Sequence, residues 1–318
     1  MRALRWVLLV AVALGALLVA VEIALRIGGA GPRLGYSDVP LGIAVPDRAL
    51  GYVLSPSGTV SFGGVATHLD ANGLRNPSPP PDGPISVLVI GDERTFGWGV
   101  ADGETYPAQL EAWIRTRCPT CGRVVNAGVP GYTTYQGVVQ ARDLGNRFRP
   151  KTVIVAFGLN DALLDGAQAG ATTLPPPLAR ASAVAGRLYE WLHRPGTGWW
   201  DAVPRTPVPR FSRNLRALVS EVRRFGGVPV LLNIGYGAGL PDPGADAGKR
   251  LRRGRIEDDY HGETRLVSEL EYTPLVDVVG AELDATTMLD AIHPSAEGHR
   301  RIAVALGERL AAEGLVTP

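Results

Sequence analysis

The chain has 318 residues, of which 45% are hydrophobic, and this is enough apolar material to bury one large core or two smaller ones. Its formal net charge is +1 at pH 7, and its 32 basic residues are spread along the chain. The composition therefore excludes an intrinsically disordered chain, and the absence of a basic block argues against a nucleic-acid partner.

The N-terminal segment has the composition of a membrane span. Residues 6–25 form an almost continuous apolar run, which matches the ~20 residues that a helix needs to cross a bilayer. Arg2 and Arg5 precede the run and favour a cytoplasmic N-terminus, with the C-terminal domain in the periplasm or at the cell surface. A cleaved signal peptide is the alternative, but its apolar core would be shorter and would end in small residues. We predict that 1–27 is an uncleaved transmembrane signal anchor, with Glu22 at the outer interface.

Residues 28–84 separate this anchor from the rest of the chain. The segment begins with a linker rich in glycine and proline and ends in the proline-rich connector PSPPPDGP, 77–84. Between them, 51–76 contains short alternating stretches broken by turn residues. We expect a linker and a small β-rich lead-in.

From residue 85 to residue 318 the pattern predicts one α/β domain in which strands alternate with helices. Such alternation indicates a parallel sheet that is doubly wound, with helices on both faces in three layers. The strands are expected at 85–91, 123–128, 152–158, 228–235 and 274–280, and the helices at 105–117, 134–148, 211–226 and 296–314. Two long insertions, 165–209 with Trp199 and Trp200, and 235–250, are expected to wall a cleft.

Two cysteines, Cys118 and Cys121, occur in the stretch RCPTCGR. A zinc site would need further thiolates or well-spaced histidines, and the five histidines are dispersed, so no metal site is predicted. Outside the cytoplasm a local disulfide is favoured. A redox motif is the weaker alternative, because the pair follows a predicted helix, whereas a thioredoxin-like pair opens one.

Polar motifs follow the predicted strands in order. They are GDERTFG from Gly91, NAGVPG from Asn126, GLND from Gly158 and, before the last helix, DAIHP from Asp290. This set resembles the four motif blocks of the SGNH, or GDSL-type, hydrolases, a family of esterases, lipases and acyltransferases. The resemblance covers residue 85 to the C-terminus and implies a flavodoxin-like three-layer fold and chemistry on acyl esters of envelope carbohydrate or lipid. No metal or organic cofactor is implied, and no oligomeric state is predicted.

The resemblance also implies roles for individual residues. His293 would be the base and Asp290 the group that orients it, because two residues three apart can hold a carboxylate against one imidazole nitrogen. The oxyanion donors would be the backbone N–H of Glu93, the backbone N–H of Gly128 and the side-chain amide of Asn160. Asp92 and Asp161 are expected to be structural. Each residue also has an ordinary interpretation as a turn, cap or helix-start residue, and their joint occurrence at the strand ends favours a site.

The chain departs from the family at Glu93, which stands where the nucleophilic serine is expected. Thr95 and Ser295 do not obviously replace that serine. A glutamate carboxylate reaches further than a hydroxymethyl group, and could itself accept hydrogen bonds from the oxyanion donors. Three hypotheses therefore stay open. The first is a catalytically inactive binding or scaffold module that holds an envelope glycan, lipid or protein, and the second is an enzyme that uses the Glu93 carboxylate, as in glycoside hydrolysis. The third, which the remaining motifs favour as the main prediction, is an ester hydrolase or acyltransferase with a nucleophile from elsewhere or a residual rate.

Overall fold

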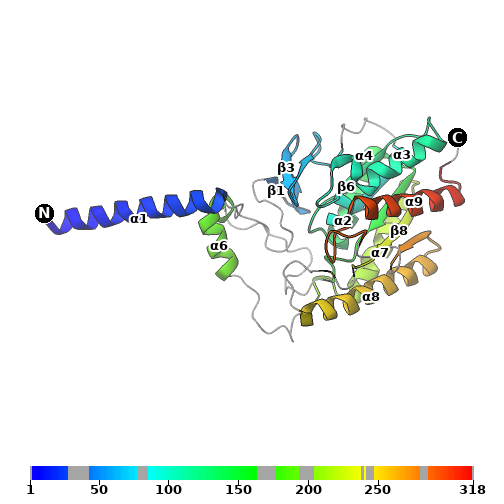
Figure 1. Cartoon of the computed structure of the whole chain (residues 1–318). Helices are drawn as coiled ribbons and strands as arrows, with labels where there is room; N and C mark the ends of the chain where they lie inside the picture. The colour runs from blue at the N-terminus through cyan, green and yellow to red at the C-terminus, as the bar shows by residue number, and fades with distance from the viewer. Residues whose placement is uncertain are drawn as a thin grey trace.

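The computed structural model in Figure 1 describes residues 2–27, 43–76, 85–162, 177–192, 204–237, 240, 247–279 and 286–316. The linker predicted at the start of 28–84 and the connector 77–84 lie outside these residues, as do Trp199 and Trp200.

A five-stranded parallel sheet forms the centre of the domain. Its strands are β5 (Val87–Gly91), β6 (Val124–Gly128), β7 (Thr152–Ala156), β8 (Val228–Ile234) and β9 (Leu275–Val278), in the order β6-β5-β7-β8-β9. Every residue of β5, β6 and β7 is buried, as expected for strands covered on both faces. The strand order is that of a flavodoxin-like sheet, and the predicted α/β fold class is confirmed.

Helices cover both faces of this sheet. Helices α3 (Tyr106–Arg117) and α9 (Ala296–Ala312) pack together on one face, where Leu110, Ile302 and Leu306 are fully buried. On the other face lie α4 (Thr134–Phe148), α7 (Val208–Arg224) and α8 (Ala247–Leu270). The sequence analysis did not predict α8, because this segment is rich in charged residues and its few apolar residues give little helical periodicity.

The β-rich lead-in consists of two antiparallel hairpins. Strand β1 (Ala44–Asp47) pairs with β2 (Gly51–Leu54), and β3 (Thr59–Phe62) pairs with β4 (Val65–His68). Tyr52, Leu54 and Phe62 are buried in the same apolar cluster as the α4 and α7 side of the sheet. The lead-in is therefore packed into the core of the domain.

Helix α1 (Arg2–Ile27) projects away from the folded domain (Figure 1). It has 26 residues, an 18-residue stretch with a mean hydropathy of 2.8 and no buried residue, so its length and composition would allow it to cross a membrane. Within the insertion 165–209, α5 (Pro177–Ala181) is followed by α6 (Ala183–Leu192), and α6 contacts α1. This described part of the insertion therefore packs against the N-terminal helix, and the expectation that it walls a cleft is not met there.

Candidate active site

The register of the sheet brings three of the sequence motifs to one edge. Gly91 at the end of β5 is opposite Gly128 of β6 on one side and Ala156 of β7 on the other. The chain therefore leaves all three strands at the same level. This is the point at which the strand order reverses, where ligands bind in open α/β sheets.

The turn after β5 presents Glu93 at this edge. A side chain at Gly91 would approach the carbonyl of Ala156 and the hydroxyl of Thr95 more closely than 3.0 Å, so only glycine fits. Asp92 then caps the short helix α2 (Glu93–Phe96) by accepting a hydrogen bond of 2.9 Å from the backbone N–H of Arg94. Glu93 is the first residue of α2, and it is only 6% exposed.

The Glu93 carboxylate accepts two hydrogen bonds through the same oxygen. The backbone N–H of Gly131 donates to Oε2 over 3.0 Å, and Nδ2 of Asn160 donates to it over 2.7 Å. The same Nδ2 also donates to the carbonyl of Tyr132, which fixes the orientation of the amide. Glu93 thus engages one backbone donor and one side-chain donor that converge on a single point.

Gly128 does not take the position expected for it. Its N–H donates over 3.0 Å to Oδ1 of Asn126, and the donor beside Glu93 is Gly131, three residues further along the same motif. A Cβ at Gly128 would lie within 3.0 Å of the backbone of Thr95 and Phe96, so this glycine lets the α2 turn pack closely on β6. Gly131 has a φ of 84°, a left-handed conformation that favours glycine.

Asp290 and His293 form the expected pair. Asp290 Oδ2 lies 2.7 Å from Nδ1 of His293, and Asp290 Oδ1 accepts the backbone N–H groups of Ile292 and His293, each over 2.8 Å. Burial acts to raise the pKa of Asp290, but these hydrogen bonds outweigh it and the pKa lies below its usual value. Trp98 stacks on the His293 ring, with centroids 5.5 Å apart. The imidazole is therefore held on its Nδ1 side and on one face.

Asp92 and Asp161 are both fully buried beneath this edge. Asp92 pairs with Arg94, whose Nη2 lies 3.1 Å from Oδ2, while burial raises the pKa of the carboxyl against the effect of the arginine charge. Asp161 accepts the Thr134 N–H and, over 2.6 Å, the Thr134 hydroxyl, and so fastens the start of α4. Burial raises the pKa of Asp161 to about 6. Both contacts stabilise the loops around the site.

The lead-in also supports the site, which its sequence does not predict. Arg75, only 3% exposed, donates to the carbonyls of Phe96, Gly97 and Val100 and pairs with Asp102 over 2.9 Å. It therefore holds the chain that follows Glu93. An arginine beside an Asn in a short polar stretch carries no signal of burial, so no sequence pattern could have revealed this.

A second lead-in contact holds the loop that carries Gly131. The Tyr52 hydroxyl donates to the carbonyl of Pro130, and the Tyr132 hydroxyl donates back to the carbonyl of Tyr52. The two rings meet edge to face, with centroids 5.4 Å apart. The lead-in thus stabilises both the segment that follows Glu93 and the loop that carries Gly131.

The remaining candidate side chains have other partners. Thr95 Oγ1 lies 2.7 Å from the Tyr106 hydroxyl, and Ser295 caps α9 by accepting from the N–H of Gly298. Cys118 and Cys121 are joined in a disulfide. Among the residues that the structure describes, no group of three or more His, Cys, Asp and Glu side chains could hold a metal ion.

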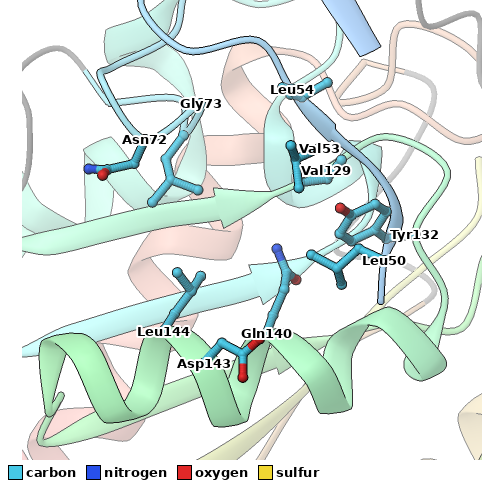
Figure 2. Close-up of a pocket in the computed structure, with 11 residues that line it drawn as sticks. Leu50, Val53, Leu54, Asn72, Gly73, Val129, Tyr132, Gln140, Asp143 and Leu144 are labelled. Atoms are coloured by element: carbon cyan, nitrogen blue, oxygen red, sulfur yellow. The ribbon is translucent and has the colours of Figure 1, made fainter. Parts of the chain in front are cut away.

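A cavity of about 100 Å³ lies between the lead-in and α4, apart from Glu93. It is lined mainly by aliphatic side chains of both segments, and Figure 2 shows Gln140 rising from α4 between Leu144 and Tyr132. Neither Glu93 nor Asn160 nor His293 lines it. The cavity touches the site only through the loop that contains Tyr132.

Comparison with known proteins identifies the class to which this fold and site belong. The sequence model of the GDSL-like Lipase/Acylhydrolase family matches residues 89–301, which is about two thirds of the chain. The chain therefore belongs to the GDSL-like lipase/acylhydrolase family. No curated protein matches it.

Several solved structures are similar to the chain in fold. A G-D-S-L family protein from Desulfitobacterium hafniense is 17% identical, covering 71% of this chain and 99% of its own, with a TM-score of 0.47. A catalytic mutant of Axe2, an acetylxylan esterase from Geobacillus stearothermophilus, is 20% identical. The match covers 73% of this chain and 96% of that protein, with a TM-score of 0.47. LAE5, an alpha/beta hydrolase from the metagenome of Lake Arreo, is 24% identical. The match covers 74% of this chain and 97% of that protein, also with a TM-score of 0.47.

Proposed function

We propose that this chain is a membrane-anchored, extracytoplasmic member of the family that binds an envelope glycan or lipid without hydrolysing esters through a serine. The observation that carries the proposal is the pair of hydrogen bonds to Glu93 Oε2 from Gly131 and Asn160. In an acyl-transfer site, a backbone N–H and a side-chain amide aimed at one point stabilise the developing oxyanion. Here a carboxylate of the protein itself takes both donors, so an ester carbonyl would have to displace it.

The same contacts argue against Glu93 as the reacting group. A carboxylate oxygen that accepts two hydrogen bonds is stabilised as an acceptor and is correspondingly less nucleophilic. The Asp290–His293 pair, in contrast, keeps a geometry suited to proton transfer. We therefore favour a binding module over carboxylate chemistry, and we expect the pair to regain a role once a hydroxyl nucleophile is present.

The experiment that tests this proposal compares full-length wild type, Glu93→Ser and Glu93→Gln on 4-nitrophenyl acetate. We expect wild type and Glu93→Gln to show no hydrolysis that depends on His293. Glu93→Ser frees both donors and supplies the nucleophile, so its rate should rise at least about 100-fold above that of wild type. Adding His293→Ala to Glu93→Ser should abolish the gain.

Labelling with a serine-reactive phosphonate separates the alternatives. Only Glu93→Ser should be labelled if the proposal is correct. Labelling of wild type at another hydroxyl would instead favour an ester hydrolase with a nucleophile from elsewhere. Wild-type hydrolysis that disappears in Glu93→Gln would favour catalysis by the carboxylate, and either outcome would overturn the binding-module proposal.

The proposed location depends on α1 and on the disulfide. An apolar helix of 26 residues with no buried side chain is suited to a bilayer, and Arg2 and Arg5 before it favour a cytoplasmic N-terminus. The disulfide between Cys118 and Cys121 is of the kind that persists in oxidising compartments. Both features support a domain outside the cytoplasm, where envelope glycans and lipids are accessible.

A further inference from the structure

The acidic residue near the end of α1 has specific partners outside its own helix. Glu22 accepts hydrogen bonds from the backbone N–H groups of Ala183 over 2.9 Å and Val184 over 3.0 Å, and from the Ser182 hydroxyl over 2.9 Å. These groups form the N-terminus of α6, 160 residues away in the chain. Glu22 therefore caps a second helix from within the first.

This arrangement compensates the charge of Glu22. The first N–H groups of a helix have no partner within the helix, and a carboxylate is stabilised there by the helix dipole. Arg26, one turn further along α1, completes the junction by donating to Glu22 over 2.6 Å and to the carbonyl of Ala181. Both oxygens of this carboxylate, which would be costly without a partner at the end of an apolar span, thus accept hydrogen bonds.

The contact between α1 and α6 involves few side chains of α1. Within the last seven residues of α1, only Glu22 and Leu25, three residues apart on one face, are partly covered. On the other side of the junction, Ala179 of α5 and Ala183 of α6 are buried, and their small side chains allow the helices to approach.

One exposed face of α6 is apolar, and Arg187 is exposed next to it. Leu188 and Leu192 are one helical turn apart, and they are 54% and 61% exposed. Val184, one turn earlier, lies on the same face. Leu178 of α5 is 71% exposed. In water these leucines would leave apolar side chains exposed beside α1, which is itself apolar over most of its length.

Figure 1 shows that α6 leaves the C-terminal end of α1 and runs across the direction of α1 rather than along it. If α1 crosses a bilayer, a helix that extends sideways from its outer end lies in the plane of the membrane surface. An amphipathic helix in this position buries its apolar face at the boundary between head groups and acyl chains.

We propose that α6 is an interfacial helix that lies on the outer surface of the bilayer crossed by α1, with Leu188 and Leu192 inserted among the lipids and Glu22 fixing its position. The occupant of the apolar face is the phospholipid bilayer. This inference rests on the membrane anchor of the proposed function, and it adds a second contact with the membrane. Such a contact would restrict the orientation of α1 in the bilayer.

The test uses full-length protein in phosphatidylethanolamine and phosphatidylglycerol vesicles, with benzoylphenylalanine placed at one position at a time. Leu9, in the N-terminal half of α1, reports on the anchor, and Leu188 and Leu192 report on α6. Tyr272, which is 92% exposed on the folded domain, is the matched control for a solvent-facing side chain. After irradiation, mass spectrometry of the intact protein detects an added lipid.

We expect lipid adducts at Leu9, Leu188 and Leu192 and none at Tyr272. Adducts at Leu9 without adducts at Leu188 and Leu192 would overturn the inference and leave the anchor intact. Cross-links from Leu188 to residues of the folded domain would also overturn it, because the apolar face would then be covered by the protein. The absence of adducts at Leu9 would instead refute the anchor and with it the inference.

The role of Glu22 is tested in the same assay. Glu22→Ala removes the cap of α6 and should lower the lipid adduct at Leu188 roughly fivefold, which is the population shift expected for loss of one helix cap. The adduct at Leu9 should not change. Glu221→Ala on α7, which also removes a carboxylate paired with an arginine, is the control and should leave both adducts unchanged. An unchanged Leu188 adduct in Glu22→Ala would refute the positioning role.

Discussion

At the scale of single residues, the defining feature of the site is the Glu93 carboxylate, which accepts hydrogen bonds from two donors. Glu93 differs from serine in reach as well as in charge, and its Oε2 extends to the N–H of Gly131 and the amide of Asn160. The expectation that a glutamate could accept hydrogen bonds from oxyanion donors is met for Asn160. It is not met for Gly128, because Asn126 takes that N–H and the motif presents Gly131 instead.

Asp161 is one residue whose ionisation should affect stability. Burial raises its pKa from 3.8 to about 6, so the folded state holds this proton more tightly than the unfolded state. The free energy of unfolding should therefore fall as the pH rises from about 4 to about 6 and level off above that, by roughly 3 kcal/mol at most. Asp161→Asn should remove this dependence.

Urea denaturation at several pH values between 4 and 7 measures this effect. The comparison is between wild type and Asp161→Asn, with Asp143→Asn as a control, because Asp143 has a 60% exposed side chain and pairs with the exposed Arg142. Wild type and Asp143→Asn should lose stability in parallel across this range. If wild type and Asp161→Asn have the same pH dependence, the assignment to Asp161 is wrong.

At the scale of elements, the lead-in is part of the site's support. It contributes Arg75 to the segment after Glu93 and Tyr52 to the loop that carries Gly131. The sequence predicted short strands there, since alternation and turn residues are local signals. Its packing against α4 and β6 depends on residues that are distant in the chain, and local patterns do not report such contacts.

Arg75→Lys should show how much the lead-in contributes to the free energy of unfolding of the domain. A lysine keeps the charge but lacks the planar fork that reaches several carbonyls and Asp102 together, so buried acceptors lose their donors. We expect a loss of about 2 to 4 kcal/mol in the free energy of unfolding, measured by chemical denaturation.

The matched control for this prediction is Arg115→Lys on α3. Arg115 is 54% exposed and pairs with Glu111 one turn away, so the change should cost less than about 0.5 kcal/mol. A similarly small cost for Arg75→Lys would mean that its buried contacts with the carbonyls contribute little, and that the lead-in does not brace the site.

At the scale of the whole molecule, the proposed orientation places the domain outside the cytoplasm. A C-terminal tag that follows a specific protease site should be released when the protease is added to intact spheroplasts. A tag placed before Arg2 should be released only after lysis, because the arginines retain the N-terminus inside. Release of the C-terminal tag only after lysis would show that the orientation is wrong.

The sequence by itself determined the layered α/β fold, since the alternation of apolar strands with amphipathic helices is local and strong. It also determined the Asp290–His293 pair, because three residues of chain are enough to bring these side chains together. The sequence did not predict α8, because this helix shows little apolar periodicity of its own. It packs against α7, and that contact is not visible in the local sequence.

Only the tertiary structure decided which groups meet at Glu93. The identity of the second donor depends on the path of the loop after β6, where a left-handed glycine turns the Gly131 N–H toward the α2 turn. The partners of Arg75 and the partners of Glu22 in α6 are tens to more than a hundred residues away, and nothing in the adjacent sequence encodes them. Contacts of this kind arise from the packing of whole elements, whereas strands, helices and short motifs arise from neighbouring residues.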